Sequence, residues 1–283
     1  MLSAAIQLNA GPDSAANLAA GVAAVREAAA AGAKLAVLPE KWVAHGDAAV
    51  LSAAARPIED WSNGPLQALA TELGIDLVAG SVSERASDGD ARLFNTSLHL
   101  SPGGQPAAAY RKVHLFDADV AGRRYRESDD ERAGDALVVS PLAGADLHLG
   151  LAICFDLRFP ELFGALADQG AGVIALPSAF TERTTRDHWE VLVRARAIET
   201  GAYVIAANQC GGYADGSRTG GSSLIVAPWG EVLARAGGDE PEIIYAEIDA
   251  TQIDAAREAL PVRRLRRPEL YGGGAADTQP TAP

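Results

Sequence analysis

Short, continuous runs of apolar residues alternate along this chain with longer stretches in which apolar residues recur every three or four positions. The short runs are typical of buried strands, and the longer stretches are typical of helices with one buried face. Strands are predicted over residues 3–8, 34–38, 75–80, 93–100, 107–112, 147–153, 172–176, 202–207, 222–227, 231–235 and 243–248. Helices are predicted over residues 14–31, 65–73, 161–168, 186–200 and 252–259. Because the two kinds of element interleave from one end to the other, the pattern predicts an α/β fold.

The pattern contains no sign of a boundary between domains. Neither a linker-like change of composition nor an internal repeat interrupts residues 1–271, which are therefore expected to form a single domain. Residues 272–283 read GGGAADTQPTAP and are expected to form a flexible tail, because this composition offers little to bury.

Composition and charge exclude several classes of protein. The chain has 283 residues, a formal net charge of −13 and two cysteines. Acidity disfavours binding to nucleic acid or anionic membranes, and two cysteines are too few for a disulfide framework or a four-cysteine zinc site. No run of about eighteen apolar residues is present, and the N-terminal stretch lacks the basic start and apolar core of a signal peptide. We therefore expect a soluble, cytoplasmic protein that binds neither nucleic acid nor membrane.

Almost all of the positive charge is carried by arginine. Of the 24 basic residues, only Lys34, Lys41 and Lys112 are lysines. A lysine is a compact point charge, whereas arginine is a wide planar fork. Each lysine in this chain is therefore worth examining for a role that arginine fills poorly.

Three chemically distinct side chains follow predicted strands directly. Glu40 comes after KLAVLP, Lys112 ends AAAYRK, and Cys154 follows LHLGLAI. Ligands usually bind at the carboxyl ends of strands in α/β folds. A carboxylate, an ammonium and a thiol that converge there would make a nucleophilic site.

The residue types define the chemistry of such a site. A free thiol has a pKa near ~8.5 and is mostly protonated at neutral pH, so a neighbouring carboxylate is needed to take its proton during attack. An ammonium lowers the cost of the thiolate and of the oxyanion that forms when the thiolate adds to a carbonyl. The backbone N–H of Phe155 is a candidate second oxyanion donor. Each residue alone has a simpler explanation, as an inert buried thiol, a turn residue or a surface lysine. Cys210 is interpreted as such a structural thiol.

The combination is more specific than its parts. The segments LPEKW, YRKVHLFD and GLAICFDLRFPEL surround the three candidates in this order, and with them the chain resembles the nitrilase superfamily of carbon–nitrogen hydrolases over residues 3–271. The resemblance implies a four-layer αββα sandwich that pairs into homodimers or larger homo-oligomers. It implies that Glu40 is the general base, Lys112 the cation that stabilises the intermediate, and Cys154 the acylated nucleophile. It also implies a second glutamate in the loop after the lysine, where Glu127 stands.

Further segments resemble one branch of that superfamily. RESDDERAG, PSAF, HWEVLVRARAIET, YVIAANQCG and RRPELYG are similar to segments of the Nit branch, which contains deaminated glutathione amidases and omega-amidases. The resemblance therefore implies an amidase that hydrolyses the C–N bond of a small, carboxylate-bearing omega-amide, of the deaminated glutathione or 2-oxoglutaramate type, through a cysteine thioester.

A carboxylate-bearing substrate requires a cation in its pocket. Arg158 stands where related carbamoylases bind a substrate carboxylate, but a structural ion pair with Glu161 or Asp156 explains it equally well. Further candidates for the pocket are Phe180, Thr181 and His188. The segment TERTTRDHW departs from the branch, because Thr185 stands where a glycine is common. This change leaves the triad untouched and alters a loop that borders the substrate pocket, so the natural substrate stays open, as does the size of the oligomer.

Two other functions stay open at this point. An N-carbamoyl-amino-acid hydrolase or a nitrilase would use the same triad, and a non-catalytic binding protein would keep only the scaffold. Neither a G-x-G-x-x-G segment nor a P-loop occurs, and the five histidines lack the spacing of metal ligands, so we expect neither cofactor nor metal. His114, two residues after Lys112, is interpreted as structural rather than as part of a cysteine–histidine pair.

Overall fold

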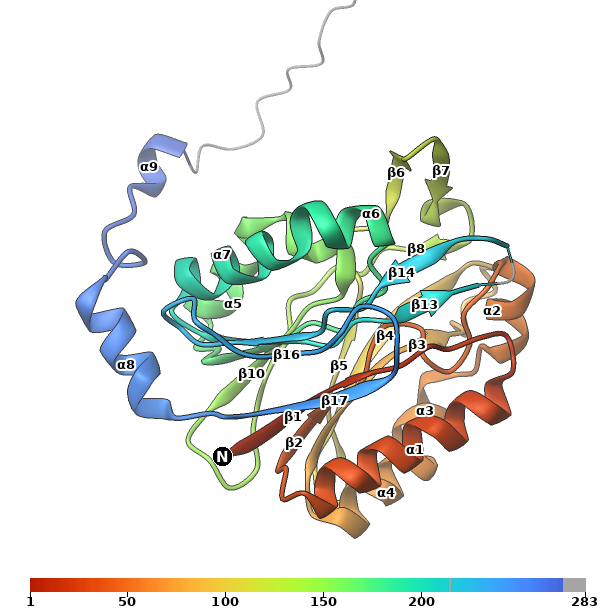
Figure 1. Cartoon of the computed structure of the whole chain (residues 1–283), viewed down its shortest axis with the longest axis horizontal. Coiled ribbons are helices and arrows are strands. Elements are labelled where there is room, and N and C mark those ends of the chain that lie inside the picture. Colours follow the sequence, from red (N-terminus) through yellow and green to blue (C-terminus); the bar gives the residue numbers. More distant parts are fainter. Residues whose placement is uncertain (214, 272–283) are drawn as a thin grey trace, which may run out of the picture.

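The computed structural model describes residues 1–213 and 215–271. Two β-sheets stack face to face, and helices cover the outer side of each sheet (Figure 1). The chain therefore forms the four-layer αββα sandwich that the resemblance implies. The expected tail, residues 272–283, lies outside the described residues.

The first sheet has the order β17-β1-β2-β3-β4-β5, with β8 paired to β4. Its strands are β1 (Leu2–Gln7), β2 (Leu35–Val37), β3 (Asp76–Glu84), β4 (Leu93–Leu100), β5 (Pro106–Arg111), β8 (Glu131–Arg132) and β17 (Glu242–Glu247). Strands β1, β2 and β3 are parallel, whereas β3, β4 and β5 form an antiparallel meander. The helices on its outer side are α1 (Ser14–Ala30), α2 (Ala48–Ala54), α3 (Ile58–Ser62) and α4 (Pro65–Leu73).

The second sheet has the order β16-β15-β12-β11-β10-β9. Its strands are β9 (Val139–Pro141), β10 (His148–Leu151), β11 (Val173–Ala175), β12 (Tyr203–Ala206), β15 (Leu224–Val226) and β16 (Val232–Arg235). The parallel strands β10, β11 and β12 form its centre. Helices α5 (Pro160–Asp168) and α7 (Glu190–Thr200) cover its outer side (Figure 1).

Short elements surround one end of the two sheets. They are the hairpins β6 (Asp117–Val120)–β7 (Arg123–Arg126) and β13 (Cys210–Gly212)–β14 (Arg218–Gly220), the 3-10 turns η1 (Glu127–Asp129) and η2 (Cys154–Arg158), α6 (Glu182–Thr184) and the π-helical turn η3 (Thr185–Trp189). Helices α8 (Ala250–Ala259) and α9 (Pro268–Tyr271) follow the last strand. Within the described ranges, no helix is long and apolar enough to cross a membrane.

Every strand and helix predicted from the sequence is present, with bounds that differ by a few residues. Two differences stand out. Strand β3 runs to Glu84, beyond the predicted end at residue 80. The helix predicted over residues 186–200 is α-helical only from Glu190, because Thr185–Trp189 form a π-helical turn. The elements that the pattern missed are α2, α3, α6, α9, the turns η1 and η2, and the short strands β6–β9, β13 and β14, most of them too short to carry a periodic signal.

Side-chain alternation explains how one strand serves two layers. In β2, Leu35 and Val37 pack between the sheets, while Ala36 and the following Leu38 pack on the other face among residues of α1 and α4. A strand that is buried on both faces has no polar positions, and this is why such strands appear in the sequence as continuous apolar runs.

A buried polar contact joins the two sheets. Nε2 of His99 on β4 lies 2.9 Å from Asp76 Oδ1 on β3, and its Nδ1 contacts the hydroxyl of Ser140 on β9 in the other sheet. The second oxygen of Asp76 accepts the backbone N–H of Ala143 at 2.9 Å. All three side chains are buried, so this serine–histidine–aspartate arrangement is structural.

Asp76→Ala is therefore expected to destabilise the fold by about 2–4 kcal/mol, because it leaves His99 Nε2 and the backbone N–H of Ala143 without their buried partner. Denaturant unfolding followed by circular dichroism measures the change. The matched control is Glu72→Ala, which removes an exposed carboxylate paired with Arg26 and is expected to change the midpoint far less. Equal midpoints for the two variants would contradict the assignment.

Candidate active site

The structure brings Glu40, Lys112 and Cys154 together at one end of the two sheets. Glu40 follows β2, Lys112 follows β5, and Cys154 begins the turn after β10. Their relative exposures are 3%, 1% and 8%, so the charged groups lie almost out of contact with water. The strand-end positions predicted from the sequence thus converge in one buried cluster.

Glu40 is held from several directions. Its Oε1 accepts hydrogen bonds from Lys112 Nζ and Asn95 Nδ2, both at 2.9 Å. Its backbone carbonyl accepts from Gln209 Nε2 at 3.0 Å. The loop passes close to β3 at Gly80, where a Cβ atom would lie 2.1 Å from the carbonyl oxygen of Pro39. Glycine at this position therefore lets the loop that carries Glu40 approach the sheet.

Lys112 lies between two carboxylates. Its Nζ is 2.9 Å from Glu40 Oε1, 2.8 Å from Glu127 Oε2 and 3.1 Å from Glu127 Oε1. Burial alone would lower the pKa of Lys112, but Glu127 and Glu40 outweigh burial and raise it well above its usual value. Lys112 is therefore a permanent ammonium and a poor proton donor.

Glu127, which begins η1, accepts hydrogen bonds at both of its carboxylate oxygens. In addition to the two contacts with Lys112, its Oε2 accepts a hydrogen bond from the backbone N–H of Phe116 at 2.6 Å, and its Oε1 accepts one from Lys41 Nζ at 2.9 Å. Burial alone would raise the pKa of Glu127, but the two lysines hold it well below the usual range. A carboxylate in this state is suited to position Lys112 rather than to accept a proton.

Cys154 occupies a strained turn. Its φ is +45°, in the left-handed region that non-glycine residues rarely adopt, and its backbone N–H donates to Pro177 O at 2.9 Å. Burial raises the pKa of the Cys154 thiol well above its usual range, and Glu40 raises it further, while Lys112 opposes both. Glu40 and the backbone N–H of Ala179 both act on the pKa of the thiol and are therefore its neighbours. The resting nucleophile is thus a protonated thiol beside a carboxylate.

Asp156 ties the cysteine turn to the lysine strand. Its Oδ2 accepts from the Tyr110 hydroxyl at 2.7 Å and from the Ile153 N–H at 2.8 Å. Its Oδ1 accepts from the His114 backbone N–H at 3.2 Å and lies 2.7 Å from His114 Nδ1. Since Tyr110 and His114 flank Lys112 in the chain, this buried carboxylate sets the distance between the ammonium and the thiol. His114 belongs to this support and stacks on Phe159.

Arg158 lies beside the cysteine turn without a carboxylate partner among the described residues. Its Nη1 is 3.3 Å from His188 Nδ1, and its guanidinium lies over the rings of Phe155 and Phe180, 5.7 and 5.3 Å from their centroids. The alternative of an ion pair with Glu161 or Asp156 is not observed. Burial lowers the pKa of Arg158, while Cys154 acts in the opposite direction, which places the two groups in electrostatic reach of each other.

The departure at Thr185 has a local explanation. The Thr185 hydroxyl donates to Phe180 O at 3.2 Å, and its side chain fills the space over Gly220, where a Cβ atom would lie 2.3 Å from Thr185 Cβ. Thr181 caps α6 and forms an isolated bridge with Thr219. Thr185 and Gly220 therefore complement each other, and the changed loop is anchored to the β13–β14 hairpin.

Sequence reasoning missed several residues of this cluster. Asn95 lies on the predicted strand 93–100, but nothing in the sequence indicates that it binds Glu40. Asp156 occurs within the GLAICFDLRFPEL segment without a distinct signal of its own. Lys41 carried a signal in being one of three lysines, whereas Glu131 carried none. Both contact the cluster through Glu127 or Lys41.

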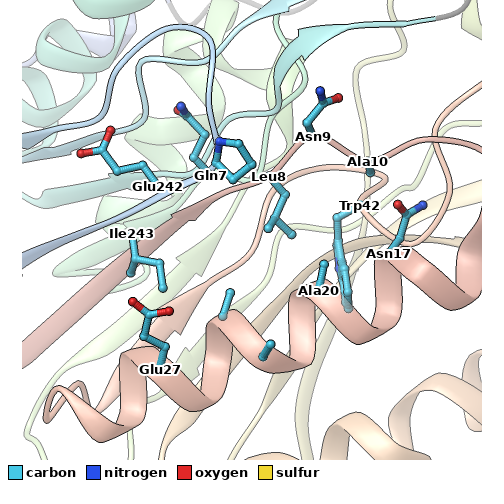
Figure 2. Close-up of a pocket in the computed structure, with 13 residues that line it drawn as sticks. Gln7, Leu8, Asn9, Ala10, Asn17, Ala20, Glu27, Trp42, Glu242 and Ile243 are labelled. Atoms are coloured by element: carbon cyan, nitrogen blue, oxygen red, sulfur yellow. The ribbon is translucent and has the colours of Figure 1, made fainter.

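A pocket lies away from this cluster. It has a volume of about 330 Å³ and is formed by α1, β1 and β17 (Figure 2). Leu8, Trp42 and Ile243 line it together with alanines of α1, and Glu27 and Glu242 stand at its side. No cysteine, serine, histidine, lysine or arginine lines it, so this pocket lacks the groups for nucleophilic chemistry.

Comparison with known proteins shows the family of the chain. Residues 2–258 match the carbon–nitrogen hydrolase family. Deaminated glutathione amidase from Homo sapiens is 39% identical over 280 residues, which cover 96% of this chain and 84% of that protein. An omega-amidase from Xenopus tropicalis is 37% identical over 248 residues, 87% of this chain and 88% of that protein. The solved structure of a Saccharomyces cerevisiae member of branch 10 of the nitrilase superfamily covers 94% of this chain and 96% of that one, with 32% identity and a TM-score of 0.84.

Proposed function

The chain belongs to the carbon–nitrogen hydrolase family and is a hydrolase of amide C–N bonds, and from this premise we propose that Cys154, Glu40 and Lys112 carry out the reaction. The observation that carries the proposal is the contact of a buried thiol with a carboxylate that also accepts from a buried ammonium. The nucleophile, the proton acceptor and the fixed positive charge are therefore in mutual reach.

In the acylation step, Cys154 Sγ attacks the amide carbon while its proton passes to Glu40. A carbon–sulfur bond forms, and the carbonyl oxygen becomes an oxyanion stabilised by Lys112 Nζ and the backbone N–H of Phe155. The intermediate collapses as the C–N bond breaks. Glu40 then returns the proton to the nitrogen, which leaves as ammonia or an amine, and the enzyme remains as a thioester.

In the deacylation step, water takes the place of the thiol as the nucleophile. Glu40 takes a proton from water as the water oxygen attacks the thioester carbon, and the same ammonium and N–H stabilise the second oxyanion. The carbon–sulfur bond breaks and Glu40 returns the proton to Cys154 Sγ. The product leaves as a carboxylic acid, which gives its remaining proton to the solvent and becomes a carboxylate. Lys112 keeps its proton throughout, because its pKa is far above neutrality. Glu127 acts by holding Lys112.

We infer a small omega-amide with its own carboxylate as the substrate, of the deaminated glutathione or 2-oxoglutaramate type named for the relatives above. The half-buried guanidinium of Arg158, without an anionic partner in the described part of the chain, supports this inference. A substrate carboxylate would supply the missing counter-ion. The same part of the site contains the other three candidates for substrate binding. Phe180 and His188 contact Arg158, and Thr181 follows Phe180 in the chain.

A substrate panel tests this specificity. We expect kcat/KM to be highest for deaminated glutathione or 2-oxoglutaramate, and at least tenfold lower for an N-carbamoyl amino acid and for an aliphatic nitrile of similar size. Turnover confined to carbamoyl compounds or nitriles would replace the omega-amide assignment with one of those activities. Absence of any turnover would favour a binding protein on this scaffold.

Arg158→Met is expected to raise KM for an anionic omega-amide by about 10–100-fold with a smaller effect on kcat, because it removes a charge that binds the ground state and the transition state alike. Steady-state kinetics on the anionic substrate and on a neutral amide of the same length measure the effect. The matched control is Arg26→Met, an exposed arginine on α1. Equal losses on the anionic and neutral amides would contradict a carboxylate-binding role.

We also propose that the enzyme is a cytoplasmic homodimer or larger homo-oligomer. Val191 and Ile198 on α7 and the neighbouring Trp229 are large apolar side chains that are exposed in the single chain. Ile198 packs next to Gly230, which brings α7 and the loop after β15 into one apolar surface. Light scattering on wild type and on Ile198→Glu tests the assembly, and a monomeric wild type would contradict it.

A further inference from the structure

Lys41 is buried beside the proposed triad, although the triad makes no use of it. It follows Glu40 directly, and its side chain is only 14% exposed. Its Nζ is 2.9 Å from Glu127 Oε1 and 2.6 Å from Glu131 Oε1. A buried lysine that contacts two carboxylates, in a chain that uses arginine almost everywhere else, calls for a physical reason.

The contacts form one row of alternating charges. From the nucleophile outward, the order is Glu40, Lys112, Glu127, Lys41 and Glu131, and each neighbouring pair is joined by a contact of 2.6–2.9 Å. Beyond Glu127 the row therefore continues into Lys41 and Glu131, and the ion pairs of Lys41 are with Glu127 and Glu131. In a buried row, each charge depends on its neighbours, because little water is present to screen it.

We propose that Lys41 is a positioning residue for the amidase reaction, which holds Glu127 ionised against Lys112, and that Glu131 contacts Lys41 from its other side. The inference rests on the proposed function, because it assigns a task to Lys41 only if Lys112 stabilises the oxyanion. It extends the functional cluster from Glu40, Lys112, Glu127 and Cys154 to Lys41 and Glu131.

The loop geometry supports this role. Lys41 has a φ of +50°, in the left-handed region, and its backbone N–H donates to Ser81 Oγ at 3.0 Å. Two consecutive side chains of this loop therefore act on Lys112. Glu40 binds Lys112 directly, and Lys41 binds Glu127, the second carboxylate that contacts Lys112. One strained loop therefore fixes Lys112 from both flanks.

Without Lys41, Glu127 would keep a single ammonium. Its Oε1 would then retain only the 3.1 Å contact with Lys112, and its charge would be less well compensated. Proton uptake by Glu127 would become easier, and a protonated Glu127 would hold Lys112 less firmly. The loss of Lys41 should thus be felt first in the acidic range of the pH profile.

Glu131 terminates the row. It lies on β8, its side chain is 3% exposed, and its Oε2 has no hydrogen-bond partner. The charges that act on it are Lys41, Glu127 and Lys112, whereas strand β4, which pairs with β8, contributes only apolar Leu93 and Phe94 to the pairing. Burial raises the pKa of Glu131 to about 7, with Glu127 acting in the same direction and Lys41 against it. Below that pH, Glu131 is largely neutral and Lys41 serves Glu127 alone.

The test compares the pH dependence of kcat/KM for wild type, Lys41→Met, Lys41→Arg, Glu131→Gln and the double variant Lys41→Met/Glu131→Gln. Lys41→Met is expected to lower kcat at least tenfold near pH 7. It should also move the acidic limb of the profile, the range in which kcat/KM falls as the pH is lowered, to a pH about one unit higher. Lys41→Arg, which keeps the charge, should leave the limb in place even if kcat falls. Glu131→Gln should also leave it in place, because Glu131 is already protonated there. Lys34→Met, an exposed lysine, is the matched control.

The double variant separates positioning from folding. It removes both members of a buried ion pair, so it avoids an uncompensated charge and should fold even if Lys41→Met does not. Its acidic limb should lie as high as that of Lys41→Met. An acidic limb and a kcat equal to those of wild type in either variant would overturn the inference. This outcome, which concerns Lys41 alone, can be seen only if the enzyme is active. Failure of the proposed function would look different, because turnover would then survive in Cys154→Ala or be absent in wild type.

Discussion

Replacing Lys112 by methionine is expected to lower kcat/KM for an omega-amide by about 10³–10⁴-fold, which corresponds to ~4–5.5 kcal/mol of lost transition-state stabilisation. The ammonium lies in a buried site between Glu40 and Glu127, where its charge is hardly screened. Methionine is an unbranched side chain one atom shorter than lysine, and it removes the charge. Steady-state kinetics over the linear range of substrate concentration measures the loss.

Two companion variants distinguish charge from folding. Lys112→Met leaves two carboxylates without their shared cation, so Lys112→Met/Glu127→Gln removes one of them and serves as the better-folded form. Lys112→Arg keeps the charge but places it in a wide fork, and little activity should return. Folded variants that retain a tenth or more of wild-type kcat/KM would show that the oxyanion is stabilised elsewhere.

Cys154→Ala is expected to abolish turnover, with a loss on the order of 10⁵-fold or more, because no other group in the cluster can form the thioester. Alanine occupies the position of a side chain that is 8% exposed, so the fold should be retained. The measurement is product release from an omega-amide at high enzyme concentration, followed long enough to detect such slow turnover.

Cys210→Ala is the matched control for this variant. Cys210 is also a free, buried cysteine, and it lies on β13 with its backbone N–H bonded to Leu8 O. Its removal should leave kcat/KM within a few fold of wild type. Loss of activity in Cys210→Ala together with activity in Cys154→Ala would reverse the assignment of the two thiols.

Much of the fold and the core of the site could be predicted because both depend on local patterns. Buried strands appear in the sequence as apolar runs, so β2, β5 and β10 were predicted to within a few residues of their ends. Glu40, Lys112 and Cys154 stand directly after these strands. The tendency of functional groups to lie at carboxyl ends of strands then predicts that they meet, and the structure brings them together.

The supports of the site could not be predicted, because they depend on contacts between segments distant in the chain. The bond from Asn95 to Glu40 spans 55 residues, and the contact of Lys41 with Glu127 spans 86. Glu131 lies on a two-residue strand that has no periodic signal. The π-helical turn at Thr185–Trp189 cannot be told from ordinary helix in the sequence, and the contact of Thr185 with Gly220 joins segments 35 residues apart.

The two interpretations of Arg158 illustrate what tertiary structure adds. The sequence permits an ion pair with Glu161 or Asp156, since both lie within one helical turn of it. In the structure Asp156 is occupied by Tyr110, His114 and the Ile153 N–H, and Arg158 turns to aromatic rings instead. Accounting for the hydrogen bonds of a buried carboxylate therefore separates two hypotheses that spacing leaves equal.

The central claim is that Cys154 is acylated by the substrate. Rapid acid quench of enzyme mixed with an omega-amide, followed by intact mass and peptide mapping, tests this claim most directly. The account predicts a transient mass increase equal to the substrate less its amine, located on Cys154, absent from Cys154→Ala and retained in Cys210→Ala. Product formation at the wild-type rate without any adduct on Cys154, or an adduct on another residue, would contradict it.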